Sequence, residues 1–177
     1  MVAYRALLET CPADRIVMGG VSAGGNLAAA MTLRARDEGL PFPSAAILLM
    51  PEVDLTESGD SFQTNLGIDT VLIRSLMPAN QLYAAGHDLS DPYLSPLFGD
   101  FSKGFPSTFL ATGTRDLFLS NTVRMHRILR GAEITADLNV FEATPHGGFM
   151  VPTAEAEELR AEVNRFIQIQ CPGVDVS

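Results

Sequence analysis

Four short segments with the pattern of β-strands alternate with stretches of helical spacing, and this alternation constrains the fold of this chain most strongly. Residues 15–18, 45–50 and 108–112 are apolar runs, and residues 136–141 alternate apolar and polar side chains. The second is apolar throughout, as expected of a strand that is buried on both faces. Strands that alternate with helices form a parallel sheet with right-handed crossovers and with helices on its faces. We therefore expect an α/β fold, a three-layer αβα sandwich around a mostly parallel sheet.

The helices between and after these segments carry recognisable ends. One is expected over residues 26–38, a second begins at Ser120 as its cap and stops at Gly131, and a third begins at Thr153. Residues 55–107 interrupt this alternation, because they contain one helical region, about 69–83 and broken at Pro78, among polar turns. We expect one domain over residues 1–177, with this segment as an insertion that shapes a substrate site.

Composition excludes several classes of partner. The 177 residues contain 12 Lys and Arg against 21 Asp and Glu, a formal charge of −9, and the single lysine is Lys103. Such a surface has no basic stripe to neutralise phosphates, so we expect neither nucleic acid nor an anionic membrane as a partner. Cys11 and Cys171 are too few for a disulfide framework and lack metal-ligand spacing. Residues 1–9 carry charges where a signal peptide is apolar, so we expect a cytoplasmic protein.

Residues Gly20–Gly24 match the pattern G-x-S-x-G at the point where the first strand turns into a helix. In this arrangement the serine, Ser22, has a strained backbone and projects its hydroxyl above the sheet. We expect Gly20 and Gly24 to be required because the turn leaves no space for a Cβ atom. The Ala23 amide at the helix N-terminus is a candidate oxyanion donor. The alternatives are a glycine-rich turn with an incidental serine, and a phosphate loop, which would need a Lys-Ser/Thr pair that this chain lacks.

A serine nucleophile needs a base, and the chain contains three histidines. His126 lies within an expected helix and His87 within the polar insertion. His146 follows the fourth strand, at the same edge of the sheet as Ser22. We therefore expect His146 to be the base, the alternative being an ordinary turn residue.

The base in turn needs a carboxylate to orient it. Asp116 follows the third strand and so lies at the carboxyl edge of the parallel sheet, where ligand crevices form. Asp137 and Glu142 are poorer candidates, because they lie within or directly at the end of the fourth strand. The order Ser22, Asp116, His146, each after a different strand, is that of the α/β-hydrolases.

Several segments also resemble one family in detail. Residues 20–28, 113–119 and 145–149 are similar to the motifs of the hormone-sensitive-lipase-like α/β-hydrolases, the bacterial family IV esterases, and residues 51–56 and 91–96 fit the same family. The resemblance covers nearly the whole chain. It implies hydrolysis of carboxylic esters with short to medium acyl groups, without a metal or an organic cofactor. It also implies that Ser22 is the nucleophile, Asp116 the orienting acid, His146 the general base and Ala23 one oxyanion donor.

The chain departs from the family pattern in two places. Val21 stands where members commonly have Asp, a difference that does not touch the reaction. The family's other oxyanion donors come from a His-Gly-Gly-Gly motif well before the serine, and 21 residues precede Ser22 here. His146-Gly147-Gly148 comes after the acid and is not that motif.

By resemblance this is a partial, N-terminally truncated α/β-hydrolase fold, whose first strand is left as an uncovered sheet edge. Two functions then compete. The first is a serine carboxylesterase with reduced activity, and the second is a non-catalytic fragment in a paired or complemented assembly. A homo-oligomer joined through sheet edges is expected in either case.

Overall fold

The computed structural model describes residues 1–173, which fold around a four-stranded sheet. The strands run in the order β1-β2-β3-β4, and all three neighbouring pairs are parallel. Their bounds are Val17–Val21 for β1, Ala45–Leu49 for β2, Ser107–Gly113 for β3 and Ala136–Phe141 for β4. The expected α/β class is confirmed. The first strand lies later than the predicted residues 15–18, because Gly19 and Gly20 pair with β2 and belong to it.

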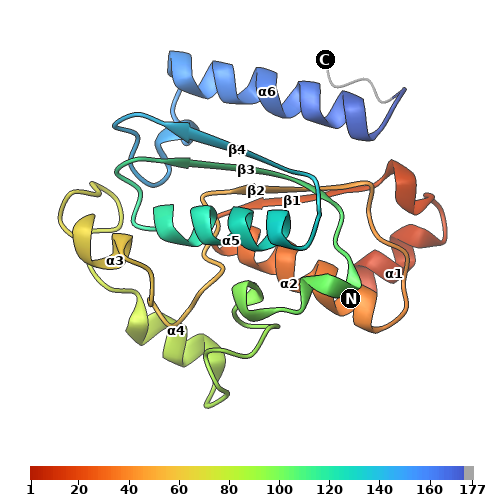
Figure 1. The fold of residues 1–177 in the computed structure, drawn as a ribbon, viewed down its shortest axis with the longest axis horizontal. Coiled ribbons are helices and arrows are strands. Elements are labelled where there is room, and N and C mark those ends of the chain that lie inside the picture. The colour runs from red at the N-terminus through yellow and green to blue at the C-terminus, as the bar shows by residue number, and fades with distance from the viewer. Residues whose placement is uncertain (174–177) are drawn as a thin grey trace.

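Helices cover both faces of this sheet (Figure 1). Helix α6 (Ala154–Gln170) lies on one face, whereas α2 (Ala23–Asp37) and α5 (Leu119–Gly131) lie on the other. The N-terminal helix α1 (Val2–Leu8) packs against the end of α2 through Tyr4, which is buried beside Ala35. The three layers match the expected sandwich.

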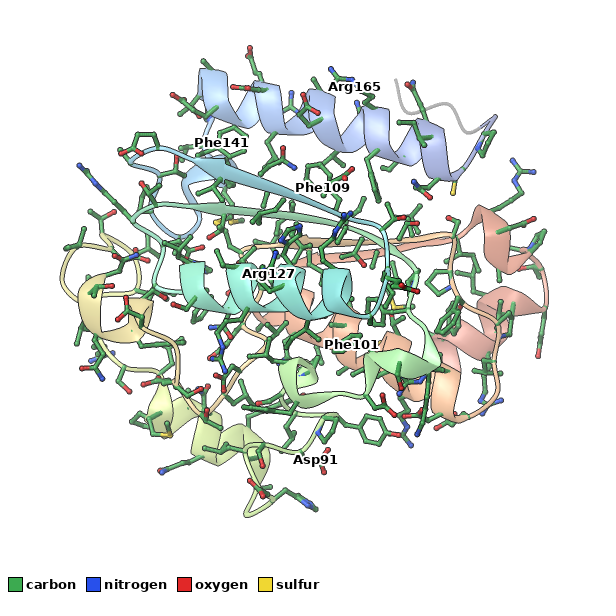
Figure 2. All side chains as sticks on the ribbon, viewed as in Figure 1. Asp91, Phe101, Phe109, Arg127, Phe141 and Arg165 are labelled. Atoms are coloured by element: carbon green, nitrogen blue, oxygen red, sulfur yellow. The ribbon has the colours of Figure 1, made fainter. Side chains whose placement is uncertain are left out.

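Side-chain alternation along the central strands explains why the sheet is covered twice. In β2, Ala46 and Leu48 face α2 and α5, whereas Ala45 and Ile47 face α6. In β3, Phe109 packs on Phe166 of α6 with ring centroids 5.5 Å apart. Figure 2 shows Phe109 on the α6 side and Phe101 on the opposite side. Because successive residues point to opposite faces, a strand that is apolar throughout needs a helix on each side.

The segment between β2 and β3 differs from its prediction. It contains α3 (Ser61–Thr64), α4 (Met77–Ala84) and two 3₁₀ turns, Pro96–Phe98 and Phe101–Lys103. The expected helix over 69–83 is wrong in its first half, where the chain forms bends and irregular loop instead. Pro78 lies in the first turn of α4 rather than interrupting a helix, and proline suits that position because its missing amide would have no partner there.

The two predicted helix caps have different outcomes. Thr153 caps α6 as expected, because its hydroxyl accepts a hydrogen bond from the Ala156 amide. Ser120 is not a cap, since α5 begins one residue before it. Instead Ser120 and Ser61 exchange two hydrogen bonds, each hydroxyl accepting from the other residue's amide at 2.9 Å. These bonds fasten α3 to the start of α5.

Two short 3₁₀ turns complete the described elements, Ala13–Arg15 before β1 and Gly148–Met150 after β4. Within residues 1–173, none of the helices has both the length and the apolar character needed to cross a membrane.

Candidate active site

Ser22 lies between the last residue of β1 and the first residue of α2. Its backbone has φ 57° and ψ −123°, a conformation that a side chain with a Cβ adopts only under strain. The surrounding hydrogen bonds hold it there: its amide donates to the Leu49 carbonyl of the neighbouring strand, and its carbonyl accepts from the Gly25 and Asn26 amides. The sharp turn therefore presents the Ser22 hydroxyl at the carboxyl edge of the sheet.

The glycines of this turn only partly follow the expected steric rule. A Cβ on Gly20 would overlap the Gly24 carbonyl, so the absence of a side chain at Gly20 is required as predicted. The reason given for Gly24 was wrong, because a Cβ there would meet no atom within 4 Å. The tight position is Gly25, where a Cβ would lie 2.8 Å from the Pro51 side chain. The close approach occurs one residue later because the helix, once begun, turns Gly25 and not Gly24 toward the end of β2.

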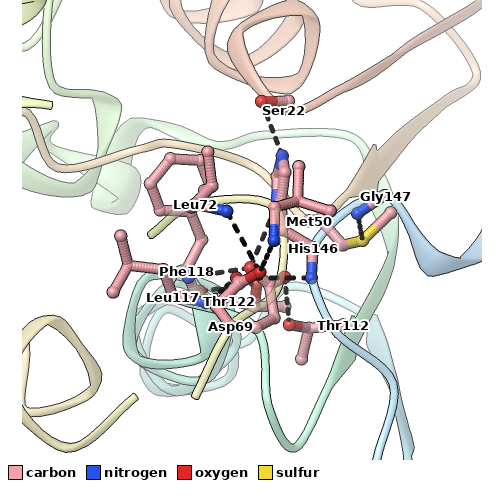
Figure 3. A network of polar contacts seen from close by, with 12 residues as sticks. Ser22, Met50, Asp69, Leu72, Thr112, Leu117, Phe118, Thr122, His146 and Gly147 are labelled. Atoms are coloured by element: carbon pink, nitrogen blue, oxygen red, sulfur yellow. Dashed lines mark hydrogen bonds and ion pairs between the residues drawn. The ribbon is translucent and has the colours of Figure 1, made fainter. Parts of the chain in front are cut away.

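His146 lies in the loop after β4 and connects the other two predicted residues. Its Nε2 atom is 3.0 Å from Ser22 Oγ, and its Nδ1 atom is 3.0 Å from Asp116 Oδ1. A carboxylate can only accept, so the Nδ1 atom carries the proton and Nε2 is left to accept from the serine hydroxyl. The structure thus brings Ser22, His146 and Asp116 into one chain of hydrogen bonds. Figure 3 shows the bond between Ser22 and His146 within this network.

Asp116 is completely buried, and its two oxygens have separate partners. Oδ1, which faces the imidazole, also accepts from the Phe118 amide at 2.9 Å, whereas Oδ2 accepts from the Thr112 hydroxyl at 2.8 Å. The Phe118 ring packs edge-on against the His146 ring, with the two ring centroids 4.9 Å apart. These contacts fix the rotation of the carboxylate and of the imidazole, and Thr112 and Phe118 were not singled out from the sequence.

The loops that bear Asp116 and His146 meet at Gly113. A Cβ on Gly113 would overlap the Thr144 carbonyl, so the end of β3 can approach the histidine loop only as glycine. The Arg115 amide donates to that same carbonyl.

A second buried carboxylate, Asp69, holds the two loops in place and was missed. Its Oδ2 atom accepts from the Leu117 amide at 2.8 Å and from the His146 amide at 3.3 Å. Its Oδ1 atom accepts from the Val71 and Leu72 amides. Asp69 is separated from Leu117 by 48 residues, and no local pattern in the polar insertion marks it.

Ala23 is the first residue of α2, so its amide has no acceptor within the helix. It is adjacent to Ser22 and lies at the positive end of the helix, as the prediction of an oxyanion donor requires. Glu52, in the loop after β2, is a further carboxyl group near this turn. Burial raises the pKa of Glu52 to about 7, a change that the nearby Glu57 supports and that Asn80 and His146 oppose.

The competing candidates lie elsewhere. His87 is exposed in the insertion, and His126 lies on α5 facing a cavity beside β4. Asp137 and Glu142 are exposed, and the His146 Nδ1 atom contacts Asp116 instead. Among residues 1–173 no three His, Cys, Asp or Glu side chains are grouped as a metal ion would need.

Comparison with known proteins agrees with this geometry. Residues 1–150 match the family described as "alpha/beta hydrolase fold". An acetyl-hydrolase of Streptomyces hygroscopicus is 36% identical over 122 residues, which are 66% of this chain and 40% of that protein. An esterase of Acinetobacter venetianus is 30% identical over 141 residues, which are 78% of this chain and 46% of that protein.

Solved structures give the same result at the level of the fold. The crystal structure of an esterase with 42% identity matches with a TM-score of 0.90 over 93% of this chain and 52% of that chain. A hormone-sensitive lipase from a metagenome library, 32% identical, matches with a TM-score of 0.91 over 96% of this chain and 58% of that chain. The chain spans less than half the length of the Streptomyces acetyl-hydrolase and of the Acinetobacter esterase. The match over residues 1–150, together with neighbours among the hormone-sensitive-lipase-like esterases, shows that the chain belongs to the α/β-hydrolase family.

Proposed function

We propose that this chain carries the catalytic residues of a serine carboxylesterase that acts on short- to medium-chain carboxylic esters. The observation that supports this most directly is the hydrogen-bonded series from Ser22 through His146 to Asp116 at one edge of the sheet. The relatives named esterase and acetyl-hydrolase support the same class of reaction.

In this reaction the Ser22 Oγ atom attacks the ester carbonyl carbon while His146 Nε2 takes the hydroxyl proton. The negative charge that develops on the carbonyl oxygen is stabilised by the Ala23 amide at the N-terminus of α2. The C–O bond to the alcohol then breaks, and His146 returns the proton to the leaving oxygen. Water repeats the same steps on the acyl-enzyme, which releases the acid and restores Ser22. Asp116 orients the imidazole and stabilises its charged form throughout.

We also propose that turnover by this chain alone is low. An oxyanion site generally uses more than one donor, and removing one donor costs about 10²–10³ in turnover. The family resemblance assigns the further donors to a His-Gly-Gly-Gly motif, and residues 1–21 of this chain do not contain one.

The second candidate is a non-catalytic part of a paired assembly. It is favoured by strand β1, which within residues 1–173 pairs on one side only, with β2. A free strand edge can accept a strand from another chain, including a second copy of this one. Light scattering tests this pairing, because a monodisperse monomer contradicts it.

The decisive experiment for the esterase proposal has two parts. Hydrolysis of a short-chain aryl ester should be lost in Ser22→Ala, with Ser102→Ala, an exposed serine before β3, as the control. An organophosphonate probe should form an adduct at Ser22, located by peptide mass spectrometry. Ester hydrolysis that survives Ser22→Ala, or an adduct at another serine, would refute the assignment.

A further inference from the structure

Met50 follows the last residue of β2 and has a backbone conformation that methionine rarely adopts. Its φ is 46°, in the left-handed region, where residues other than glycine are uncommon. Its amide donates to the Ala111 carbonyl of β3 at 2.7 Å, and the residue is 1% exposed. Strained residues of this kind persist where the surrounding contacts fix them, and they cluster at functional sites. Met50 is therefore a candidate for a role in the site beside it.

The Met50 sulfur lies against the loop that bears His146 (Figure 3). The Gly147 amide donates to Met50 Sδ at 3.2 Å. Gly147 has φ 71° and stands at the start of the 3₁₀ turn Gly148–Met150, so its amide has no acceptor within that turn. The thioether supplies the missing acceptor, although sulfur accepts only weakly. The Met50 side chain thus holds the residue directly after the histidine.

The backbone on either side of Met50 holds the Ser22 turn. The Leu49 carbonyl accepts from the Ser22 amide at 2.9 Å, and the Glu52 amide donates to the Ser22 carbonyl at 3.3 Å. One short segment therefore contacts the nucleophile turn through its backbone and the histidine loop through the Met50 side chain. The 3.0 Å distance between Ser22 Oγ and His146 Nε2 spans these two parts.

The two carboxylates that hold the histidine come from other parts of the chain. Asp69, in the insertion, accepts from the His146 amide at 3.3 Å. Asp116, after β3, lies 3.0 Å from the His146 Nδ1 atom. These contacts set the loop and the imidazole relative to the acid. The contact with Met50 sets the same loop relative to Ser22, because Met50 adjoins the residue that binds the Ser22 amide.

We propose that Met50 is a positioning residue, whose sulfur holds Gly147 and thereby sets the distance from the His146 imidazole to the Ser22 hydroxyl. Met50 is buried and acts through the loop rather than on the ester. Transfer of the serine proton requires the base within hydrogen-bond reach, and a displacement of about 1 Å can cost about 10²-fold in rate. This inference rests on the proposed esterase function, because it concerns the same serine and histidine.

The test removes the sulfur and keeps the volume. Met50→Leu retains the Cβ atom and an apolar side chain of similar size, but leucine cannot accept a hydrogen bond. The rate at which an organophosphonate modifies Ser22 is measured by mass spectrometry over a range of probe concentrations. Met50→Leu should lower the maximal rate about 10-fold and leave the half-saturating probe concentration unchanged, because binding of the probe does not use the proton transfer.

Two further variants separate positioning from packing. Met125→Leu on α5 is the matched control, since Met125 is completely buried among apolar side chains, and it should leave the maximal rate unchanged. Met50→Gln places an amide oxygen that can accept from Gly147, so it should react faster than Met50→Leu. A maximal rate in Met50→Leu within about two-fold of the wild type, or equal rates in Met50→Leu and Met50→Gln, would overturn the inference.

NMR supplies a readout that does not depend on ester chemistry. The proton between His146 Nδ1 and Asp116 resonates far downfield and reports the geometry of the imidazole, whereas the Gly147 amide reports the bond to sulfur. Met50→Leu should shift both signals and speed hydrogen exchange at the Gly147 amide about 5-fold, as loss of one hydrogen bond predicts. Met125→Leu should leave both signals in place.

These signals also separate the two ways in which the reasoning can fail. If no probe modifies Ser22 in the wild-type chain, the proposed esterase function fails, and the role of Met50 is judged by NMR alone. A shifted His146 proton together with faster exchange at Gly147 supports positioning. If Met50→Leu leaves the His146 proton where it is in the wild type, the Met50 side chain does not position the imidazole and the inference is overturned.

Discussion

The buried carboxyl group of Glu52 should make the free energy of unfolding depend on pH, and Glu52→Gln should remove that dependence. The pKa of Glu52 is about 7 in the folded chain, because burial disfavours its charged form, against 4.5 for a free glutamate. Between these two values the unfolded chain has lost the proton and the folded chain still holds it. The folded state then binds more protons, so its stability falls as pH rises from about 4.5 to about 7 and changes little above that.

The size of the effect follows from the same two values. Each pH unit between them corresponds to about 1.36 kcal/mol, so the full penalty for ionising the buried group is about 3 kcal/mol. Between pH 5 and pH 8 the wild-type chain should lose about 2.5 kcal/mol of stability relative to Glu52→Gln. A domain of this size has about 5–15 kcal/mol in total, so the loss is readily measured. Glutamine keeps the shape of the side chain and has no charge to bury.

Urea unfolding of the wild-type chain and of Glu52→Gln at pH 5 and pH 8 measures the effect. Subtracting one free energy of unfolding from the other at each pH cancels the contributions of the titrating groups that both proteins share. Glu158→Gln, on the exposed side of α6, serves as the control, and its effect should stay within about 0.5 kcal/mol at both pH values. A stability difference between the wild type and Glu52→Gln that is the same at pH 5 and at pH 8 would refute the argument. Glu52 would then be ionised and solvated in the folded chain.

Three further sets of substitutions test individual contacts of the fold. Gly25→Ala should destabilise the chain by about 1–3 kcal/mol, because the added methyl group clashes with Pro51. Gly24→Ala should be neutral or stabilising by up to about 1 kcal/mol, because it adds a helix-forming residue in open space. Thermal unfolding of the two variants measures the difference, and a Gly24→Ala variant less stable than Gly25→Ala would contradict this account of the turn. Asp69→Ala should lower the free energy of unfolding, measured in urea, by about 3 kcal/mol and slow the modification of Ser22, because the Leu117 and His146 amides lose their acceptor. Asp69→Asn should retain part of the stability and part of the rate, since its amide oxygen can still accept. Arg124→Met should cost about 1–3 kcal/mol by removing the cation that lies 2.7 Å from the buried Asp54 carboxylate, and unfolding curves equal to those of the wild type would show that this ion pair contributes nothing.

The layered fold could be predicted because its signals are local. Strand β2 is apolar throughout, the other strands are short apolar or alternating segments, and the helices show helical spacing, so the parallel sheet follows from their alternation. The boundaries moved where tertiary contacts decided them. Strand β1 continues through two glycines because Gly19 and Gly20 pair with Ile47 and Leu48 of β2. Serine often caps a helix, but Ser120 instead exchanges two hydrogen bonds with Ser61 of the insertion.

The catalytic candidates could be predicted for a different reason. In a parallel sheet, the residues that follow each strand gather at one edge, so three polar residues after three strands are placed together without any knowledge of side-chain packing. The partners of these residues could not be found in this way. Thr112 lies inside an apolar strand, and Asp69 lies in a polar segment where carboxylates are common. Only the folded path of the chain brings Asp69 to the His146 amide, 77 residues away.

The insertion between β2 and β3 therefore has two separate effects on the site, and substitutions in it should divide accordingly. Its first part acts on the loops of the catalytic candidates: Asp69 accepts from the Leu117 and His146 amides, and Asn65 donates to the Asp116 carbonyl at 2.8 Å. Its second part, helix α4, forms one wall of a cavity that Glu52 also lines. Changes in the first part should slow the reaction of Ser22 with an organophosphonate whatever its alkyl group, because they loosen the loops that carry Asp116 and His146. Tyr83→Ala in α4 should alter the shape of the cavity and leave the hydrogen bonds of Asn65 and Asp69 in place, because Tyr83 lines the cavity and makes neither of those bonds.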